Sequence, residues 1–334
     1  MTRWCTALLL ALTGCDDEVV GFAGEGSSSG GMASASSSSS GTVTPSEASS
    51  SSSSGEAPAT SPDFALYGLD AGLALSYDGG LSWEMVDVPE LQGFPQEAMI
   101  AGPNGLILVG GSTMATSSDG VTWVLGMIGG PPGYVRHLAS NGTRWVSVGL
   151  DHLAWSDDGV SWTDAMEGLD SFDMLEVTWG GGRFFALGFD TLLTSTDGTT
   201  WTKRGVDGSK LLSVAYANGR FVGLGEGGRI VVTENGTDLL FDQENLLPGL
   251  AGSVRSCRGG FVVASEGALF FSQDGESWDE LAAPSSGLVA CSEDSVVTVQ
   301  DGVAHHGPDE FALTSVFSFD GSPHALDYVG NAPG

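Results

Sequence analysis

The chain has very few basic residues. It contains 11 Lys and Arg against 42 Asp and Glu, so its formal net charge at pH 7 is −31. A field of this sign repels phosphate backbones and anionic lipid head groups, which argues against nucleic acid as a partner. It remains compatible with cations, with basic proteins and with neutral glycans.

Catalytic and metal-binding motifs are also scarce. There is no G-x-S-x-G sequence and no P-loop, and the five histidines show no metal-ligand spacing. We therefore expect no enzyme activity, no metal and no cofactor.

The chain has one short apolar run near its start and no long one. Residues Ala7 to Leu12 are continuously apolar, Arg3 precedes them and small residues follow. The run is too short to span a bilayer as a mature helix, and this order of charge, apolar core and small residues is typical of an export signal. The sequence predicts a signal peptide over residues 1–14.

The end of this segment, Leu12-Thr13-Gly14-Cys15, resembles the lipobox of bacterial lipoproteins. The resemblance implies cleavage before Cys15 and lipidation of that residue, and acyl chains in this number anchor a protein stably. We expect a protein of the cell envelope that is tethered to a membrane and faces the periplasm or the exterior. Which membrane it is stays open, and an ordinary signal peptide with a chance cysteine is the alternative.

A tether follows, from Cys15 to residue 62, which consists of Ser runs with Gly, Ala and Thr and almost no large apolar residues. Such a composition cannot bury enough apolar surface to fold. As a flexible coil it would reach roughly 35–40 Å from the membrane. The folded domain is therefore expected over residues 63–334, where 36 acids and 10 Lys or Arg leave a charge of −26.

One short phrase recurs along this domain, S-x-D-G-x-[ST]-W, as in Ser195 to Trp201. Its acidic position returns every 38 to 41 residues, with Asn235 in a worn copy. The Asp and Trp of the five good copies are Asp78 with Trp83, Asp119 with Trp123, Asp158 with Trp162, Asp197 with Trp201, and Asp274 with Trp278.

Each repeat holds four short strands separated by Gly-containing turns, and no segment has a helical pattern. A four-stranded unit of about 40 residues is typical of a β-propeller blade. The 272 residues of the domain predict an all-β propeller with seven blades. Because the first blade lacks an inner strand, we expect the C-terminal segment to supply it and close the ring, with Ser315 to Gly321 as the closing strand.

The phrase resembles the Asp-box, or BNR repeat, of sialidases, sortilin-type receptors and propellers of the Ycf48 class. The resemblance implies a structural hairpin between the third and fourth strands of a blade. Its chemistry agrees, because an Asp can accept bonds from nearby N–H groups, Gly takes a positive φ and Trp fills the space between sheets.

Glycan hydrolysis of the sialidase type is the enzymatic alternative. Sialidases use three arginines to hold a carboxylate. Here Arg144, Arg183 and Arg220 share one repeat position, which points to a role in the repeat instead.

An acid recurs in the turn between the second and third strands of the blades. These residues are Asp70, Asp151, Asp190, Glu226, Glu266 and Asp301. Turn chemistry alone explains Asp-Gly and Glu-Gly. The functional alternative is an acidic face that binds a cation or a basic protein patch, with Phe94, Tyr134 and Phe172 as candidate apolar anchors.

The sequence thus predicts a monomeric, non-catalytic binding or scaffold module that recognises a protein or glycan. Sialidase-like hydrolysis and a Ycf48-type assembly role are the alternatives. Two cysteines remain in the domain, Cys257 and Cys291, at the same place in consecutive repeats. A disulfide and two buried thiols both fit this placement, since an exported protein can hold a disulfide.

Overall fold

The structure is a computed structural model that describes most of the residues from 61 onward. The described ranges are 61–68, 72–129, 133–169, 172–188, 191–204, 211–248, 251–265, 268–281, 288–292, 294–307, 313–318, 323 and 325–329. The predicted signal peptide, Cys15 and nearly all of the predicted tether lie outside these ranges. Within them, no helix has the length and apolar character needed to cross a membrane.

Seven four-stranded antiparallel sheets make up the fold, as predicted. In order from the inner to the outer strand they are blade one, β28 (Ala325–Tyr328), β1 (Phe64–Gly68), β2 (Gly72–Ser76) and β3 (Glu84–Val86); blade two, β4 (Ala98–Gly102), β5 (Gly105–Gly110), β6 (Thr113–Ser117) and β7 (Val124–Met127); blade three, β8 (Tyr134–Ser140), β9 (Trp145–Leu150), β10 (His152–Ser156) and β11 (Thr163–Asp164); blade four, β12 (Met174–Gly180), β13 (Arg183–Gly188), β14 (Leu192–Ser195) and β15 (Thr202–Arg204); blade five, β16 (Leu211–Ala217), β17 (Arg220–Gly225), β18 (Arg229–Thr233) and β19 (Leu239–Gln243); blade six, β20 (Ala251–Cys257), β21 (Gly260–Ser265), β22 (Ala268–Ser272) and β23 (Asp279–Leu281); and blade seven, β24 (Leu288–Cys291), β25 (Val296–Gln300), β26 (Val303–Gly307) and β27 (Thr314–Ser318).

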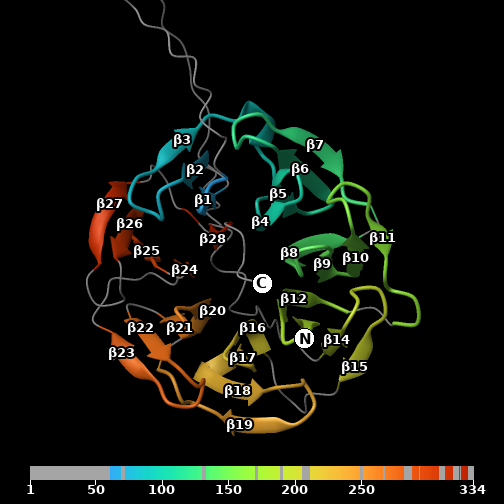
Figure 1. Ribbon diagram of the computed structural model, residues 1–334, viewed down its shortest axis with the longest axis vertical. Coiled ribbons are helices and arrows are strands. Elements are labelled where there is room, and N and C mark those ends of the chain that lie inside the picture. Colours follow the sequence, from blue (N-terminus) through green and yellow to red (C-terminus); the bar gives the residue numbers. More distant parts are fainter. Residues whose placement is uncertain are drawn as a thin grey trace, which may run out of the picture. The chain divides into compact units, whose positions relative to one another are not determined.

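The blades follow one another in sequence order around a ring, and the red strands of blade seven lie beside the blue strands of blade one (Figure 1). Each inner strand contacts the next, and β28 contacts both β24 and β4. The fold is a closed seven-bladed β-propeller.

The C-terminal strand closes the ring as expected, but the segment predicted for it was wrong. Leu326 of β28 pairs with Leu66 of β1, whereas Ser318 pairs with Val303 as part of the outer strand β27 of blade seven. The likeness of Ser315 to Gly321 to an inner strand rested on alternating apolar residues. That pattern marks a strand without saying at which edge of a sheet it pairs.

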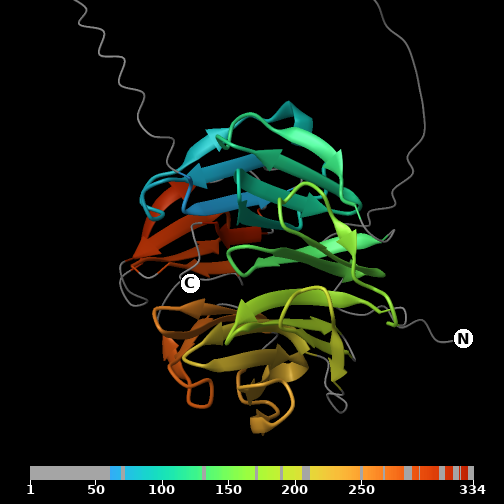
Figure 2. The same ribbon diagram turned by 45° about the vertical axis from the view of Figure 1, so that its right-hand side comes forward.

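The core lies between neighbouring blades, because each sheet presents apolar residues on both faces. Figure 2 shows adjacent sheets packed face against face. Between blades four and five, for example, the rings of Phe185 and Phe221 stack with their centroids 4.5 Å apart, and Leu187 and Val231 are buried in the same cluster. Burial on both faces explains why the inner and middle strands read as nearly continuous apolar runs.

The antiparallel order sorts the turns onto two faces of the ring. Turns between strands one and two and between strands three and four of every blade lie on one face, which we call the box-turn face. Turns between strands two and three, and the connections between blades, lie on the other face, which we call the acidic-turn face because the recurring acids fall there.

Candidate functional site

The repeated phrase folds into a closed hydrogen-bonded turn, shown by the copy in blade four. Asp197 Oδ1 accepts bonds from Ser195 Oγ at 3.0 Å and from the N–H groups of Thr199 and Thr200 at 2.8 Å. Ser195 Oγ in turn accepts the N–H of Gly198 at 2.8 Å. Gly198 has a φ of 75°, which glycine adopts without strain.

The same bonds recur in the other copies. The N–H groups of Thr122 and then Val121 donate to Asp119 and lower its pKa to about 2. In the worn copy, the amide oxygen of Asn235 accepts from the N–H groups of Thr237 and Asp238 in the same way. These oxygens are occupied by the turn itself, so the geometry gives the repeated Asp residues a structural role.

The tryptophan of each phrase seals its turn. The Nε1 of Trp83, Trp123, Trp201 and Trp278 donates to the glycine carbonyl of its own turn at 3.0–3.1 Å. Trp162 differs, because its Nε1 lies 3.3 Å from the sulfur of Met114 in blade two.

The three repeated arginines join consecutive blades on the box-turn face. Each donates from Nη1 to the main-chain oxygen at the box Asp or Asn of the next blade, Arg144 to Asp197 at 2.6 Å, Arg183 to Asn235 at 3.2 Å and Arg220 to Asp274 at 2.9 Å. They are thus distributed over three successive junctions. This placement accounts for their shared repeat position.

Three of the six recurring acids fall within the described residues. Asp151 and Asp301 occupy the left-handed region, with φ of 49° and 50°, and Glu226 begins the short 3-10 turn η3 (Glu226–Gly228). Asp tolerates positive φ better than most residues, so the backbone favours Asp at the first two positions. Asp70, Asp190 and Glu266 lie outside the described residues.

The candidate anchors on the acidic-turn face differ in exposure. Phe94 is only 6% exposed and belongs to the core, so its suggested role as a surface anchor was wrong. Phe172 packs partly against the core of blades three and four. Tyr134 is 36% exposed and donates from its hydroxyl to Glu97 at 2.6 Å.

A cavity of about 190 Å³ lies on the axis of the ring and is lined by residues of all seven inner strands, β4, β8, β12, β16, β20, β24 and β28. Its polar lining includes His137, Glu176, Arg255 and Asp327. Among the described residues, no three His, Cys, Asp or Glu side chains gather as metal ligands would.

Glu176 is the centre of a polar network in this cavity. Its Oε1 accepts from Arg255 Nη1 at 2.8 Å and lies 3.5 Å from His137 Nε2, and its Oε2 accepts the N–H of Val214 at 2.9 Å. Arg255 also donates to Ser213 Oγ at 3.3 Å. The network therefore joins blades three, four, five and six.

A second polar contact joins blades one and two beside the cavity. Asp327 of β28 accepts the hydroxyl of Tyr67 and, at 2.9 Å, the N–H of Met99. Burial first, and then the neighbouring Asp327, hold the pKa of Tyr67 well above its usual value, so the hydroxyl remains a donor. The short strand β28 is fastened to the ring by its side chain as well as by its ladder.

Sequence reasoning missed the axial residues. His137, Glu176 and Ser213 occupy equivalent places, each directly after the irregularity of its inner strand. An acid in the middle of a buried strand, as in Met174-Leu175-Glu176-Val177, was the available signal.

The structure joins Cys257 and Cys291 in a disulfide with a Cα–Cα distance of 5.2 Å. The bond links β20 of blade six to β24 of blade seven. Both residues are buried, at 4% and 8% exposure.

Comparisons with protein-family models and with curated proteins give no match. Solved structures share the fold. They include Ycf48 from Cyanidioschyzon merolae, at 14% identity with a TM-score of 0.52, covering 72% of this chain and 90% of that one. A Ycf48 with a bound D1 peptide matches at 18% identity with a TM-score of 0.55, covering 72% and 89%.

PorZ, an essential surface component of the type-IX secretion system of Porphyromonas gingivalis, matches at 12% identity with a TM-score of 0.55. The match covers 72% of this chain and 35% of PorZ, so this chain corresponds to about a third of that protein. At these identities the likeness establishes the fold.

Proposed function

We propose that this protein is a lipid-anchored scaffold of the cell envelope that binds a basic patch of a partner protein through its acidic-turn face. The observation that carries the proposal is the placement of an acid at the same turn in six of the seven blades. The antiparallel order directs these turns to one face, and the domain as a whole carries −26. Complementary charge would steer such a partner and orient it.

A binding role is also favoured by what the repeated residues do. The box Asp residues are occupied by their own turns, and the repeated arginines hold neighbouring blades together. Sialidase-like hydrolysis would need arginines that converge on a substrate carboxylate. A protein ligand also accords with the bound peptide of the structurally similar Ycf48, although that likeness concerns the fold.

The test removes charge without disturbing the turns. Asn tolerates a positive φ as Asp does, so Asp151→Asn, Asp301→Asn and Glu226→Gln together remove three charges and keep the backbone. The matched control removes three exposed charges from the outer strands β3 and β23, by Glu84→Gln, Asp279→Asn and Glu280→Gln.

Crosslinking in the intact envelope, followed by mass spectrometry, identifies the partner for each variant. We expect the crosslinked partner to be lost from the acidic-turn variant and kept by the control. Equal crosslinking by both variants would refute the acidic-turn face as the binding surface. Fluorogenic sialosides and other glycosides are tested with the same protein, and turnover abolished by a single Arg or Glu substitution would refute the non-catalytic role.

A further inference from the structure

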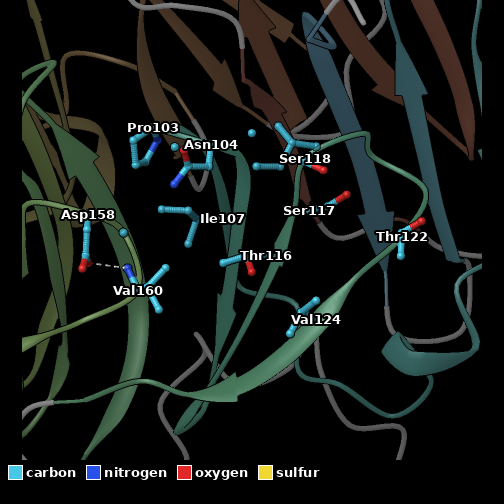
Figure 3. Close-up of a pocket in the computed structure, with 14 residues that line it drawn as sticks. Pro103, Asn104, Ile107, Thr116, Ser117, Ser118, Thr122, Val124, Asp158 and Val160 are labelled. Carbon is cyan, nitrogen blue, oxygen red and sulfur yellow. Dashed lines mark hydrogen bonds between the residues drawn. The ribbon is translucent and has the colours of Figure 1, made fainter.

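A pocket of about 270 Å³ opens on the box-turn face between blades two and three. Figure 3 shows Pro103 and Asn104 at one end, Ile107 and Thr116 along the wall, and Asp158 with Val160 on the side of blade three. The wall is mostly apolar, and nothing described above uses it.

The next junction around the ring shows what fills the equivalent space there. Between blades three and four, the guanidinium of Arg144 stacks over the ring of Trp155, 4.2 Å from its centroid, and donates to the main-chain oxygen of Asp197. The stem of this arginine covers the box glycine, since the Cβ position of Gly198 lies 3.0 Å from Arg144 Cδ. Arginine and tryptophan together fill that junction.

Both of these large side chains are replaced at the junction of blades two and three. Thr116 pairs with Ile107 as Trp155 pairs with Val146, so a threonine takes the place of the tryptophan. Gly105 precedes the residue paired with the box serine, Ser117, and this is the position of the arginine in the following three blades.

An arginine at that position is not possible in blade two. Gly105 has a φ of 127°, and a Cβ on it would lie 2.0 Å from the oxygen of Ser117. Pro103 replaces only the stem, with its Cδ 3.1 Å from the Cβ position of the box glycine Gly159. Among the described residues, no side chain donates to the oxygen of Asp158, which corresponds to the oxygen that Arg144 caps in the next blade.

We propose that this pocket binds the side chain of an arginine supplied by a partner protein. The guanidinium would donate to the main-chain oxygen of Asp158, as Arg144 does to Asp197 within the chain. Its aliphatic stem would lie between Ile107 and the rim residues Val124 and Val160, which are 66% and 59% exposed. The charge of −26 on the domain favours a cationic side chain over an anionic one.

This site lies on the face opposite the acidic turns. Its occupation therefore does not depend on the proposed function, and each of the two can fail alone.

The test uses N-acetyl-arginine methylamide as a probe, with the citrulline analogue as a neutral control of the same shape. Each is titrated into the ¹⁵N-labelled protein while the amide signals of Asn104, Gly159 and Val160 are followed by NMR. We expect saturable shifts with the arginine probe and binding about tenfold weaker with citrulline, because the charge-assisted hydrogen bond is lost.

The matched variants are Thr116→Trp, which restores the residue found at this place in blade three, and Thr116→Ser, which leaves the pocket open. We expect Thr116→Trp to abolish the shifts and Thr116→Ser to keep them. Intermolecular NOEs from the probe to the methyl groups of Ile107 and Val160 give a measurement on the unaltered protein, should Thr116→Trp fail to fold. Absence of saturation, equal binding of citrulline, or shifts without these NOEs would each overturn the proposal.

Discussion

Arg255 Nη1 donates to Glu176 Oε1 across 2.8 Å, so a side chain of blade six reaches blade four past the inner strand of blade five. Glu176 is 7% exposed, and the same carboxylate holds the N–H of Val214 in blade five. A single buried acid thus fastens three consecutive blades around the axis.

We expect Glu176→Ala to lower the free energy of unfolding by about 2–4 kcal/mol, because Arg255 and the N–H of Val214 lose their acceptor. The lower end is favoured since the Arg255 side chain is 31% exposed to water. Urea unfolding provides the measurement. Glu280→Gln on the exposed outer strand β23 is the control, with a change within about 0.5 kcal/mol. Equal midpoints for the two variants would mean that the axial network adds no stability.

The arginines between blades give a second prediction. Arg183→Ala and Arg220→Ala each remove one hydrogen bond to the next blade, so each should cost about 1 kcal/mol in urea unfolding. The two costs should add within about 0.5 kcal/mol, because the bonds lie at different junctions. Lys203→Ala, on the outer strand β15, is the exposed control. No loss in either variant would leave the repeated arginines without a stabilising role.

The bond between Cys257 and Cys291 closes a loop with a sequence separation of 34. In the chain-entropy model, a loop of this size is worth about 3–4 kcal/mol, so the double variant Cys257→Ser, Cys291→Ser should unfold at clearly lower urea. Reductant should destabilise the natural protein and leave the variant unchanged. Intact mass after alkylation checks the bond directly. Two alkylated thiols at positions 257 and 291 in the unreduced exported protein would contradict it.

The box turns make the fold sensitive to acid. Backbone donors from Thr122 and Val121 lower the folded-state pKa of Asp119 from 3.8 to about 2. A lowered pKa contributes stability that is present above the unfolded pKa and lost as pH falls through the folded one. We therefore expect the free energy of unfolding to decrease between pH 4 and pH 2.

Asp119→Asn isolates this effect, because Asn235 already forms the same turn with its amide oxygen. The variant should form the turn at pH 7 and lose less stability than the natural protein on acidification. Urea unfolding at several pH values measures both. Identical pH dependence in the two proteins would show that Asp119 does not contribute.

Membrane anchoring depends on Cys15 in our proposal. Cys15→Ser removes the sulfur that would carry the lipid, so the exported protein should move from the membrane fraction to the soluble fraction. Incorporation of labelled palmitate into the natural protein and not into the variant is the accompanying measurement. Membrane retention of the variant without any label would point to another means of attachment.

Much of the fold could be predicted from the sequence because its determinants are local. The S-x-D-G-x-[ST]-W phrase carries its whole hydrogen-bonded turn within seven residues, as Ser195 to Trp201 show, and its period of 38 to 41 residues sets the number of blades. The absence of basic residues and of catalytic motifs likewise needs no structure to be recognised.

Tertiary structure decided what residues from different blades do together. Alternating apolar residues identified Ser315 to Gly321 as strand-forming, but only the pairing of Leu326 with Leu66 showed which strand closes the ring. Glu176 meets Arg255, 79 residues away, because the inner strands converge on one axis. The pocket beside Thr116 likewise exists because large side chains fill the next junction and small ones occur here, a contrast that appears only when the blades are superimposed.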